Sequence, residues 1–133
     1  MSQENVEVIT RLVEAFNVEG PEAAGRTFFA DDVEFHDPPD APSPRVARGR
    51  EEVRSQFNSF NDAWETHRSE PREIRAAGPD RVLLVSVEHF VGRDDIEVEA
   101  PSASVFTLRN GKVIRWETFW NEQQGLEAAG LSE

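Results

Sequence analysis

RVLLVSVEHFVGRDDIEVEAPSASVFTLRNGKVIRWETFW, residues 81–120, alternates apolar and polar side chains in three runs that are separated by turn residues. Such alternation is typical of strands with one buried face. Asn110-Gly111 lies between two runs and favours a type I′ hairpin, because that turn needs a positive φ at both central residues. Gly92-Arg93-Asp94-Asp95 predicts a looser hairpin of the same kind. The stretch therefore predicts an antiparallel meander with strands at 81–92, 96–109 and 112–120.

Two further strands are predicted outside this meander. The polar run THRSEPREIRAA at 66–77 precedes it, and Pro71 within the run indicates an edge strand or a bulge, since proline cannot donate to a central ladder. Residues 33–37 are expected to add a strand from the N-terminal half. Beyond the meander, residues 122–131 predict a short terminal helix or turn.

Three helices are predicted before residue 66. The first has Ser2 as its N-cap, Gly20 as its stop, and apolar positions at helical spacing, namely Val6, Ile9, Leu12, Val13 and Phe16. Pro21 suits the first turn of a second helix, which ends at Ala30-Asp31-Asp32 and whose apolar side is Ala24, Phe28 and Phe29. Gly49 precedes a third, amphipathic helix with the apolar stripe Val53, Phe57, Phe60 and Trp64.

Helices followed by an antiparallel sheet predict the α+β class, and 133 residues fit one domain, 1–133. The chain has no cysteine, which excludes disulfides, thiolate metal sites and a cysteine nucleophile. The net charge of -12 disfavours nucleic acid and anionic membrane surfaces as partners. No stretch has the length and apolarity of a membrane span. A soluble, cytoplasmic protein is expected.

Two stretches of the sequence carry a family resemblance, namely FFADDVEFHDPPDAPSPRVARGREEVRSQF at 28–57 and RNGKVIRWETFWNEQQGLEAAGL at 109–131. In these stretches and in the order of its elements, the chain resembles the nuclear transport factor 2-like superfamily. Within it the chain is similar to the SnoaL-like group, relatives of ketosteroid isomerases, polyketide cyclases and limonene epoxide hydrolases. The resemblance covers nearly the whole chain. It implies a cone-shaped, curved antiparallel sheet wrapped around three N-terminal helices, a cystatin-like α+β barrel that encloses an apolar pocket.

The resemblance transfers one catalytic residue directly. The general base of the isomerases is the Asp of the Asp-Pro that ends the first strand, and this position falls on Asp37. Their oxyanion donors have no counterpart, because the tyrosine position falls on Leu12, the acid position falls near Ser104, and the sequence contains no tyrosine. The last-strand Asp of the cyclases and epoxide hydrolases falls on Thr118, and the adjacent Glu117 should face the opposite way unless a bulge intervenes. Steroid isomerisation is therefore not expected.

Strand alternation and the family match sort the side chains that would line the pocket. The inward sets are Ile114, Trp116, Thr118 and Trp120; Ser102, Ser104, Phe106 and Leu108; and Leu84, Ser86, Glu88 and Phe90. Glu88 would be a second inward carboxylate that forms an acid–base pair with Asp37, with the pKa of one of them raised. The predicted ligand-binding residues are Phe35, Phe57, Ser86, Ser104, Phe106, Trp116, Thr118 and Trp120.

Each of these assignments has an alternative in which the residue has only a structural role. Asp37 before proline can begin a turn by accepting backbone N–H bonds, and Glu88 can lie at the rim, because glutamate is rarely buried unpaired. Trp116 and Trp120 can be core aromatics that fill the space, as can Phe57, Phe60 and Trp64. His36 and His89 should point away from the pocket, and the histidine spacing supports no metal site.

Two functions remain open. The first is an isomerase, cyclase or hydrolase that acts on a small hydrophobic compound without a cofactor, with Asp37 as general base and Glu88 as its partner. The second is a non-catalytic ligand-binding or protein-interaction module of the same fold. In both, the pocket is entered near the proline-rich loop 38–46.

The outward face of the last two strands predicts a homodimer. Its members are Ala103, Val105, Thr107, Val113, Arg115, Glu117 and Phe119, a set too apolar to stay bare. Two copies related by a twofold axis would bury this face, and the family resemblance also implies sheet-to-sheet dimers. The alternative is a monomer in which residues 122–133 fold back over the face.

Overall fold

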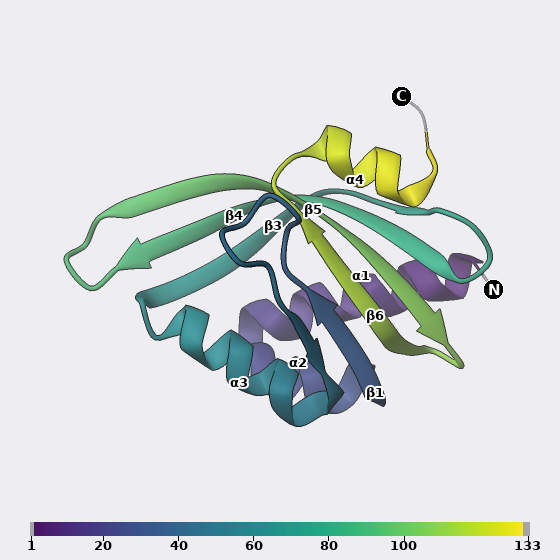
Figure 1. Cartoon of the computed structure of the whole chain (residues 1–133), viewed down its shortest axis with the longest axis horizontal. Coiled ribbons are helices and arrows are strands. Elements are labelled where there is room, and N and C mark those ends of the chain that lie inside the picture. Colours follow the sequence, from purple (N-terminus) through teal and green to yellow (C-terminus); the bar gives the residue numbers. More distant parts are fainter. Residues whose placement is uncertain (1, 132–133) are drawn as a thin grey trace.

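A computed structural model describes residues 2–131 and confirms the α+β class. In chain order the elements are α1 Ser2–Glu19, α2 Pro21–Phe28, β1 Phe29–His36, β2 Val46–Arg48, α3 Gly49–Asn61, β3 Trp64–Ala76, β4 Arg81–Gly92, β5 Glu97–Arg109, β6 Lys112–Phe119 and α4 Glu122–Ala129. Within this range the strands form one 6-stranded sheet in the order β2-β1-β6-β5-β4-β3 (Figure 1). None of the helices between residues 2 and 131 is both long and apolar enough to cross a membrane.

The predicted meander forms the larger part of the sheet. Strands β3, β4, β5 and β6 pair antiparallel with one another in chain order. Asn110 and Gly111 take φ values of 53° and 75° in the turn between β5 and β6, as the type I′ prediction requires. Strand β1 joins β6 in parallel orientation, and the short β2, which the sequence did not indicate, pairs with β1. The sheet is therefore curved and open, with β2 and β3 at its edges.

Pro71 sits where its chemistry predicts. It lies in the edge strand β3, and the pairing of β3 with β4 shifts register between Pro71 and Glu73, so both the edge and the bulge are present. Near the bulge, the side chain of Asn17 in α1 donates to the carbonyl of Ser69 at 2.8 Å and accepts the Ser69 N–H at 2.9 Å. These two bonds satisfy backbone groups that an edge strand leaves open, and they hold β3 against α1.

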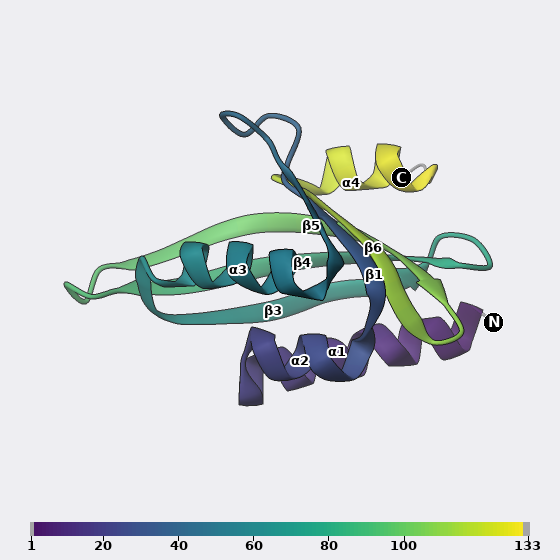
Figure 2. The same ribbon diagram turned by 60° about the horizontal axis from the view of Figure 1, so that its bottom comes forward.

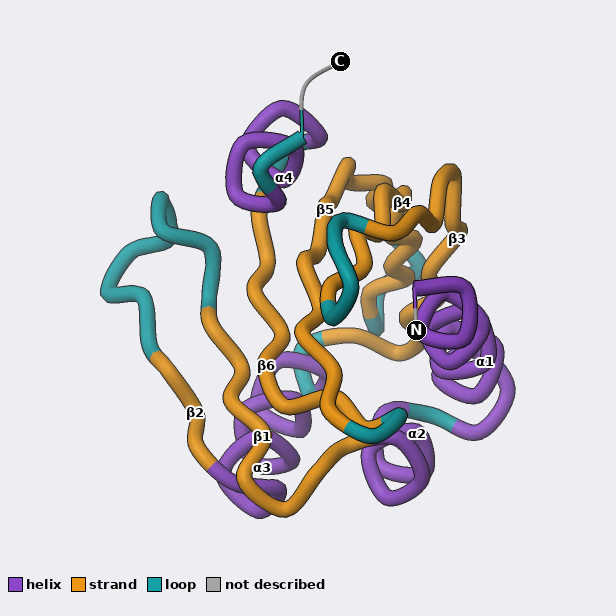
Figure 3. Tube along the Cα trace, turned by 90° about the vertical axis from the view of Figure 1, so that its right-hand side faces the viewer, coloured by secondary structure: helices purple, strands orange, loops and turns teal. Residues whose placement is uncertain are grey.

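Helices α1, α2 and α3 lie on the inner, concave side of the sheet (Figures 2 and 3). The predicted apolar stripe of α1 faces inward. The helix begins at Ser2, so Ser2 is part of the helix and not its N-cap as predicted. The main buried cluster joins helices and sheet and consists of Ile9, Leu12, Val13, Phe29, Val33, Ala47, Val53, Val82, Leu84, Phe106, Leu108 and Val113. This is the layered packing that the α+β prediction anticipated.

The outer face of the sheet is covered in part by α4, on the side opposite the other helices (Figure 2). Asn121 caps α4 by accepting the N–H of Gln124, and Arg81 donates to the last carbonyls of the helix. The cluster buried beneath α4 is Ala77, Leu83, Ala103, Val105, Phe119, Leu126 and Ala129. The terminal segment thus folds back over this face through residue 131, and residues 132–133 lie outside the described range.

This arrangement corrects four members of the predicted dimer face. Ala103 and Val105 are fully buried beneath α4 and Phe119 is only 8% exposed there, so none of the three is free for a contact between chains. Val113 belongs to the inner cluster, because the register between β5 and β6 shifts at Ile114, which no residue of β5 opposes. This extra residue reverses the alternation, so Ile114 does not head the predicted inward set of β6. The homodimer itself stays a prediction.

Two predicted helix ends are wrong. Phe29 and Ala30-Asp31-Asp32 open strand β1 and do not belong to α2 or to a break after it. Helix α3 ends at Asn61, so Trp64 is not part of its apolar stripe; Trp64 begins β3 and packs on Phe90, with ring centroids 4.8 Å apart. The spacing of four residues continued across the turn Asp62-Ala63, so the periodicity alone did not mark the end of the helix.

Substitution of Gly125 tests the close approach of α4 to the sheet. A Cβ at this position would lie 2.5 Å from the Cβ of Ala103. We expect Gly125→Ala to lower the free energy of unfolding in urea by about 1–3 kcal/mol through overpacking, although alanine is the better helix former by about 1 kcal/mol. Gln123→Ala, on the exposed side of α4, should change it by less than about 0.5 kcal/mol. A Gly125→Ala protein that is more stable than the wild type would contradict this packing.

Candidate functional site

A cavity of about 600 Å³ lies between the inner face of the sheet and helices α1 and α3. Every residue predicted for the site lines this cavity, namely Phe35, Asp37, Phe57, Ser86, Glu88, Ser104, Phe106, Trp116, Thr118 and Trp120. Most of the remaining wall is apolar and includes Leu12, Val13, Phe16 and Phe90. The structure therefore brings the predicted set together, while the roles of its members remain predictions.

Trp116 is the centre of the aromatic wall. Its neighbouring ring centroids are those of Phe106 at 5.0 Å, Phe35 at 5.1 Å and Phe57 at 5.2 Å. Its indole N–H donates to the hydroxyl of Ser104 at 2.9 Å, so the polar atom is satisfied within an apolar surface. Trp120 is 48% exposed. Because the cavity stays open beside both tryptophans, they do not fill it in the way that the core-aromatic alternative requires.

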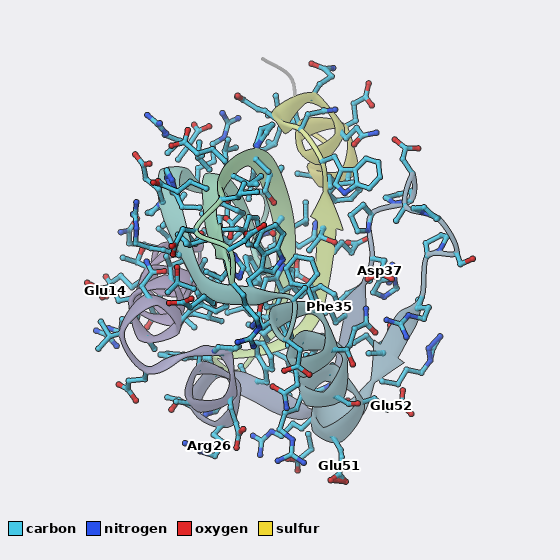
Figure 4. The ribbon with its side chains drawn as sticks, turned by 90° about the vertical axis from the view of Figure 1, so that its left-hand side faces the viewer. Glu14, Arg26, Phe35, Asp37, Glu51 and Glu52 are labelled. Atoms are coloured by element: carbon cyan, nitrogen blue, oxygen red, sulfur yellow. The ribbon has the colours of Figure 1, made fainter. Side chains whose placement is uncertain are left out.

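Asp37 closes a turn, as one alternative predicted, and it also lines the cavity, whereas its role as a base stays a prediction. It follows the last residue of β1, and its carboxylate accepts the backbone N–H of Arg45 at 3.0 Å and the side-chain amide of Gln56 at 2.6 Å. The Asp37 N–H donates to the Arg45 carbonyl at 3.0 Å. These bonds close the loop between β1 and β2, while the carboxylate also forms part of the cavity wall beside Phe35 (Figure 4).

The loop between β1 and β2 forms one rim of the cavity. Its residues Pro38, Ala41 and Arg45 line the cavity together with Asp37. From the other side of the sheet, the side chain of Gln124 in α4 donates to the carboxylate of Asp40 at 2.6 Å. The loop is thus bonded at its base to β1 and α3 and at its tip to α4. This is the loop near which the sequence predicted the entrance to the pocket.

Glu88 lies inside the cavity and has donors of its own. Its carboxylate accepts from His67 Nε2 at 2.7 Å, from the Ser69 hydroxyl at 2.8 Å and from the Ser86 hydroxyl at 2.6 Å. We call these four residues the Glu88 cluster. Burial acts to raise the pKa of Glu88, but the hydrogen bonds from His67, Ser86 and Ser69 outweigh it, so the pKa lies below the ordinary range of a glutamate.

This arrangement corrects the predicted pairing of Glu88 with Asp37. Glu88 is bonded within its own cluster, whereas Asp37 is bonded to Arg45 and Gln56, so among the described residues the two carboxylates share no hydrogen-bond partner. The pKa of Glu88 is lowered and not raised, because its partner is an imidazole and two hydroxyls. The rim alternative is also wrong, since only 17% of the Glu88 side chain is exposed. The cavity has two separate polar centres.

His67 is the site residue that sequence reasoning missed. Its ring stacks on Phe90 at a centroid distance of 4.4 Å and meets the ring of Phe16 edge-on at 4.9 Å. The register shift after Pro71 explains why it was missed: Ile74 faces the inner cluster, and unbroken alternation from it would turn His67 outward. Pro71 signalled an irregularity, but it could not give the register beyond it.

The three positions at which the resemblance placed a catalytic tyrosine or acid hold side chains that make other contacts. Leu12 lines the cavity as a buried apolar side chain, and the hydroxyl of Ser104 accepts the indole N–H of Trp116. The hydroxyl of Thr118 donates to the carbonyl of His36 at 2.8 Å and so joins β6 to β1. None of the three side chains can act as a carboxylic acid. The other two histidines pair with glutamates away from the cavity, His36 with Glu34 and His89 with Glu70 and Glu99.

An open, curled sheet with helices over its concave face and an apolar cavity between them is a small α+β fold that a solved nuclear transport factor 2-like structure shares. The family model of the SnoaL-like domain matches residues 9–116. The chain therefore belongs to the SnoaL-like family, as the sequence resemblance indicated.

Solved structures share this fold at low sequence identity. A nuclear transport factor 2-like protein of unknown function from Burkholderia pseudomallei superposes with a TM-score of 0.77 at 17% identity, over 96% of this chain and 97% of the other. A candidate SnoaL-like polyketide cyclase from Jannaschia sp. CCS1 gives 0.76 at 16% identity, over 96% and 92%. TerC, crystallised with polyporic acid, gives 0.76 at 18% identity, over 96% and 98%. A search of curated proteins finds no match.

Glu88→Gln tests the charge of the Glu88 cluster through pH. Because the folded-state pKa of Glu88 is lowered, its contribution to stability is complete above the ordinary glutamate pKa of about 4.3 and is lost as the pH falls through the folded-state pKa. We expect the variant to lose about 2 kcal/mol at pH 7 in urea unfolding, and the difference from the wild type to shrink in acid. Glu70→Gln, in the half-exposed pair with His89 outside the cavity, should have a smaller effect, since water screens it in part. A pH-independent difference for Glu88→Gln would refute the assignment.

Proposed function

We propose that this protein binds a small, largely apolar molecule in the cavity and acts on it without a cofactor, with Asp37 as general base. The observation that carries the proposal is the cavity itself. Its volume of about 600 Å³ and its aromatic wall suit a molecule of one to a few rings, and it has a carboxylate at each of two separate places. Apolar walls with few polar groups are typical of sites that orient a substrate for proton transfer.

Asp37 suits the role of base by its surroundings. Its side chain is 22% exposed, so it keeps access to a bound molecule while Gln56 and the Arg45 N–H fix its orientation. Each carboxylate oxygen has lone pairs left after these bonds. A proton removed from a carbon next to a carbonyl, or from an attacking water, would complete an isomerisation, a cyclisation or a hydrolysis.

The relatives support the ligand class. TerC was crystallised with polyporic acid, and the Jannaschia protein is named as a candidate polyketide cyclase. The alternative is a non-catalytic binding module, which is favoured by Thr118 and Leu12 at positions where the enzymes carry an acid and a tyrosine. Both readings require the cavity, and only the first requires Asp37 to move a proton.

The test of binding uses 4-nitroanisole as an apolar aromatic probe in isothermal titration calorimetry. Wild type is expected to bind it with a negative heat-capacity change. Ser102→Trp places a large ring in the cavity wall and should abolish the binding. Absence of binding to the wild type would overturn the proposed function. The same two proteins can be extracted and the extracts compared by mass spectrometry, in order to identify a compound carried only by the wild type.

Catalysis is tested with the compound that is extracted only from the wild type. Its proton exchange in D2O is monitored by NMR. Wild type should exchange a carbon-bound proton, and Asp37→Asn should slow the exchange by about 10²–10⁴-fold while the affinity stays unchanged. Asp40→Asn is the matched control, since Asp40 lies in the same loop and its carboxylate is bonded to Gln124. Equal exchange by wild type and Asp37→Asn would exclude Asp37 as base, and no exchange by the wild type would favour the binding module.

We also infer a homodimer through the part of the outer face that α4 leaves uncovered. This part includes Arg115 and Glu117, which are 3.3 Å apart within one chain, and the half-buried Val85. A face that mixes apolar and charged side chains is typical of an interface. Light scattering should give a mass near twice 15.0 kDa, and a mass near 15.0 kDa at micromolar concentration would contradict the dimer.

A further inference from the structure

The Glu88 cluster is an unusual feature for a wall that is otherwise largely apolar. An ionised carboxylate, an imidazole and two hydroxyls occupy the inner faces of β3 and β4. Removing such groups from water is costly, and apolar residues of similar volume would hold the two strands together as well. Stability alone therefore gives no reason for a histidine and a glutamate at this place.

The hydrogen bonds of the cluster leave one ring nitrogen for other use. A carboxylate can only accept, so Nε2 of His67 carries a proton and donates it to Glu88 at 2.7 Å. The two serine hydroxyls donate to the other carboxylate oxygen. Nδ1 of His67 lies 3.4 Å from Oδ1 of Asn61, which is longer than the roughly 3.2 Å limit of a firm N–H···O bond. Glu88 thus fixes the tautomer of the neutral ring, in which Nδ1 carries a lone pair, has this long contact with Asn61 and can take a proton.

The surroundings of His67 suit a flat ligand. Its side chain is 12% exposed, and its ring is held between Phe90 on one face and the edge of Phe16. The half-exposed ring of Phe60 stands 6.2 Å away and also lines the cavity. An aromatic or conjugated ring that enters here would pack on these side chains and would bring a substituent to the imidazole.

We propose that His67 is a second acid–base group of the cavity, oriented by Glu88, which exchanges a proton with the hydroxyl or enol oxygen of an aromatic or conjugated ligand. The inference rests on the proposed function, because it needs a ligand in the cavity. In the step, the O–H bond of the ligand breaks and an N–H bond forms at Nδ1, which leaves an oxyanion beside an imidazolium whose Nε2–H stays on Glu88. The reverse step returns the proton. Asp37 would act on carbon or water at its own place, and His67 would act on oxygen.

The proposal gives the two polar centres distinct tasks. A reaction that removes a proton from carbon needs an acid to neutralise the oxygen on which charge develops. The relatives use a tyrosine, a protonated Asp or a last-strand Asp for this, and none of these is present at the matching positions Leu12, Ser104 and Thr118. After Nδ1 has taken a proton in the step above, the imidazolium of His67 would return that proton to the oxygen from β3.

The experiment uses two matched probes, 4-nitrophenol and 4-nitroanisole, in the second of which a methyl group replaces the exchangeable proton. Glutamine at position 67 keeps a donor for Glu88 but cannot accept a proton, so His67→Gln is the test variant. His89→Gln is its control, because His89 has the same kind of glutamate partner at 2.8 Å outside the cavity. Affinities are measured by calorimetry, and ionisation of bound 4-nitrophenol is measured by its absorbance near the ordinary histidine pKa of about 6.5.

We expect wild type and His89→Gln to bind 4-nitrophenol about tenfold more tightly than His67→Gln does and to hold a larger ionised fraction of it, while all three bind 4-nitroanisole equally. Equal binding and ionisation of 4-nitrophenol by wild type and His67→Gln would overturn the role of His67 and leave the proposed function standing. Failure of the wild type to bind either probe would overturn both.

A second measurement does not depend on the folding of the variant. In wild-type protein labelled with ¹⁵N, the ring nitrogens of His67 should shift on addition of 4-nitrophenol toward the values of an imidazolium, and they should not do so with 4-nitroanisole. A purely structural His67–Glu88 pair would respond to both probes alike, and that result would overturn the proposal.

Discussion

The site depends on one geometric constraint, the strict alternation of side chains between the two faces of a strand. Because the period is two, a single extra residue exchanges inner and outer side chains for the rest of the strand. Two of the register shifts in the sheet decide which side chains face inward around the cavity. The bulge after Pro71 turns His67 and Ser69 toward the cavity, and the bulge at Ile114 lets both Val113 and Trp116 point inward. Without the first bulge, Glu88 would face the cavity with neither its imidazole nor the Ser69 hydroxyl.

The same constraint explains how the fold carries a charge in an apolar cavity. Ser86 and Glu88 lie two apart on β4 and therefore share a face, and Ser69 pairs directly with Glu88 across the ladder. The carboxylate is thus met by donors that the sheet itself holds in place, which is the condition under which a buried charge is tolerated. Asn17 secures the weakest point of this arrangement, the edge strand, by bonding both backbone groups of Ser69.

Most helices and strands of the fold could be predicted from the sequence, because a pattern within a few residues indicates each of them. Asn110-Gly111 specified its turn, Pro71 specified an edge and a bulge, and the inward faces of β4 and β5 followed from uninterrupted alternation. The failures share a cause, which is that the deciding contact is distant. Trp64 left the helical stripe to pack on Phe90 of β4, and Phe119 was buried by α4. His67 could not be placed, because the residues that a bulge turns inward are known only once the paired strand is known.

The inner face of the sheet changes character along its strands, and this separates stability from chemistry. At one end of β4 and β5 the inward residues are Val82 and Leu84 with Phe106 and Leu108, all within the main buried cluster. Toward the other end the same rows continue as Ser86 and Glu88 with Ser104 and Ser102, all in the cavity wall. The closed end supplies the apolar burial that holds helices to sheet, at about 25 cal/mol for each Å² removed from water. The open end can therefore carry polar groups, and a ligand there meets Ser86, Glu88 and Ser102, none of which belongs to the main buried cluster.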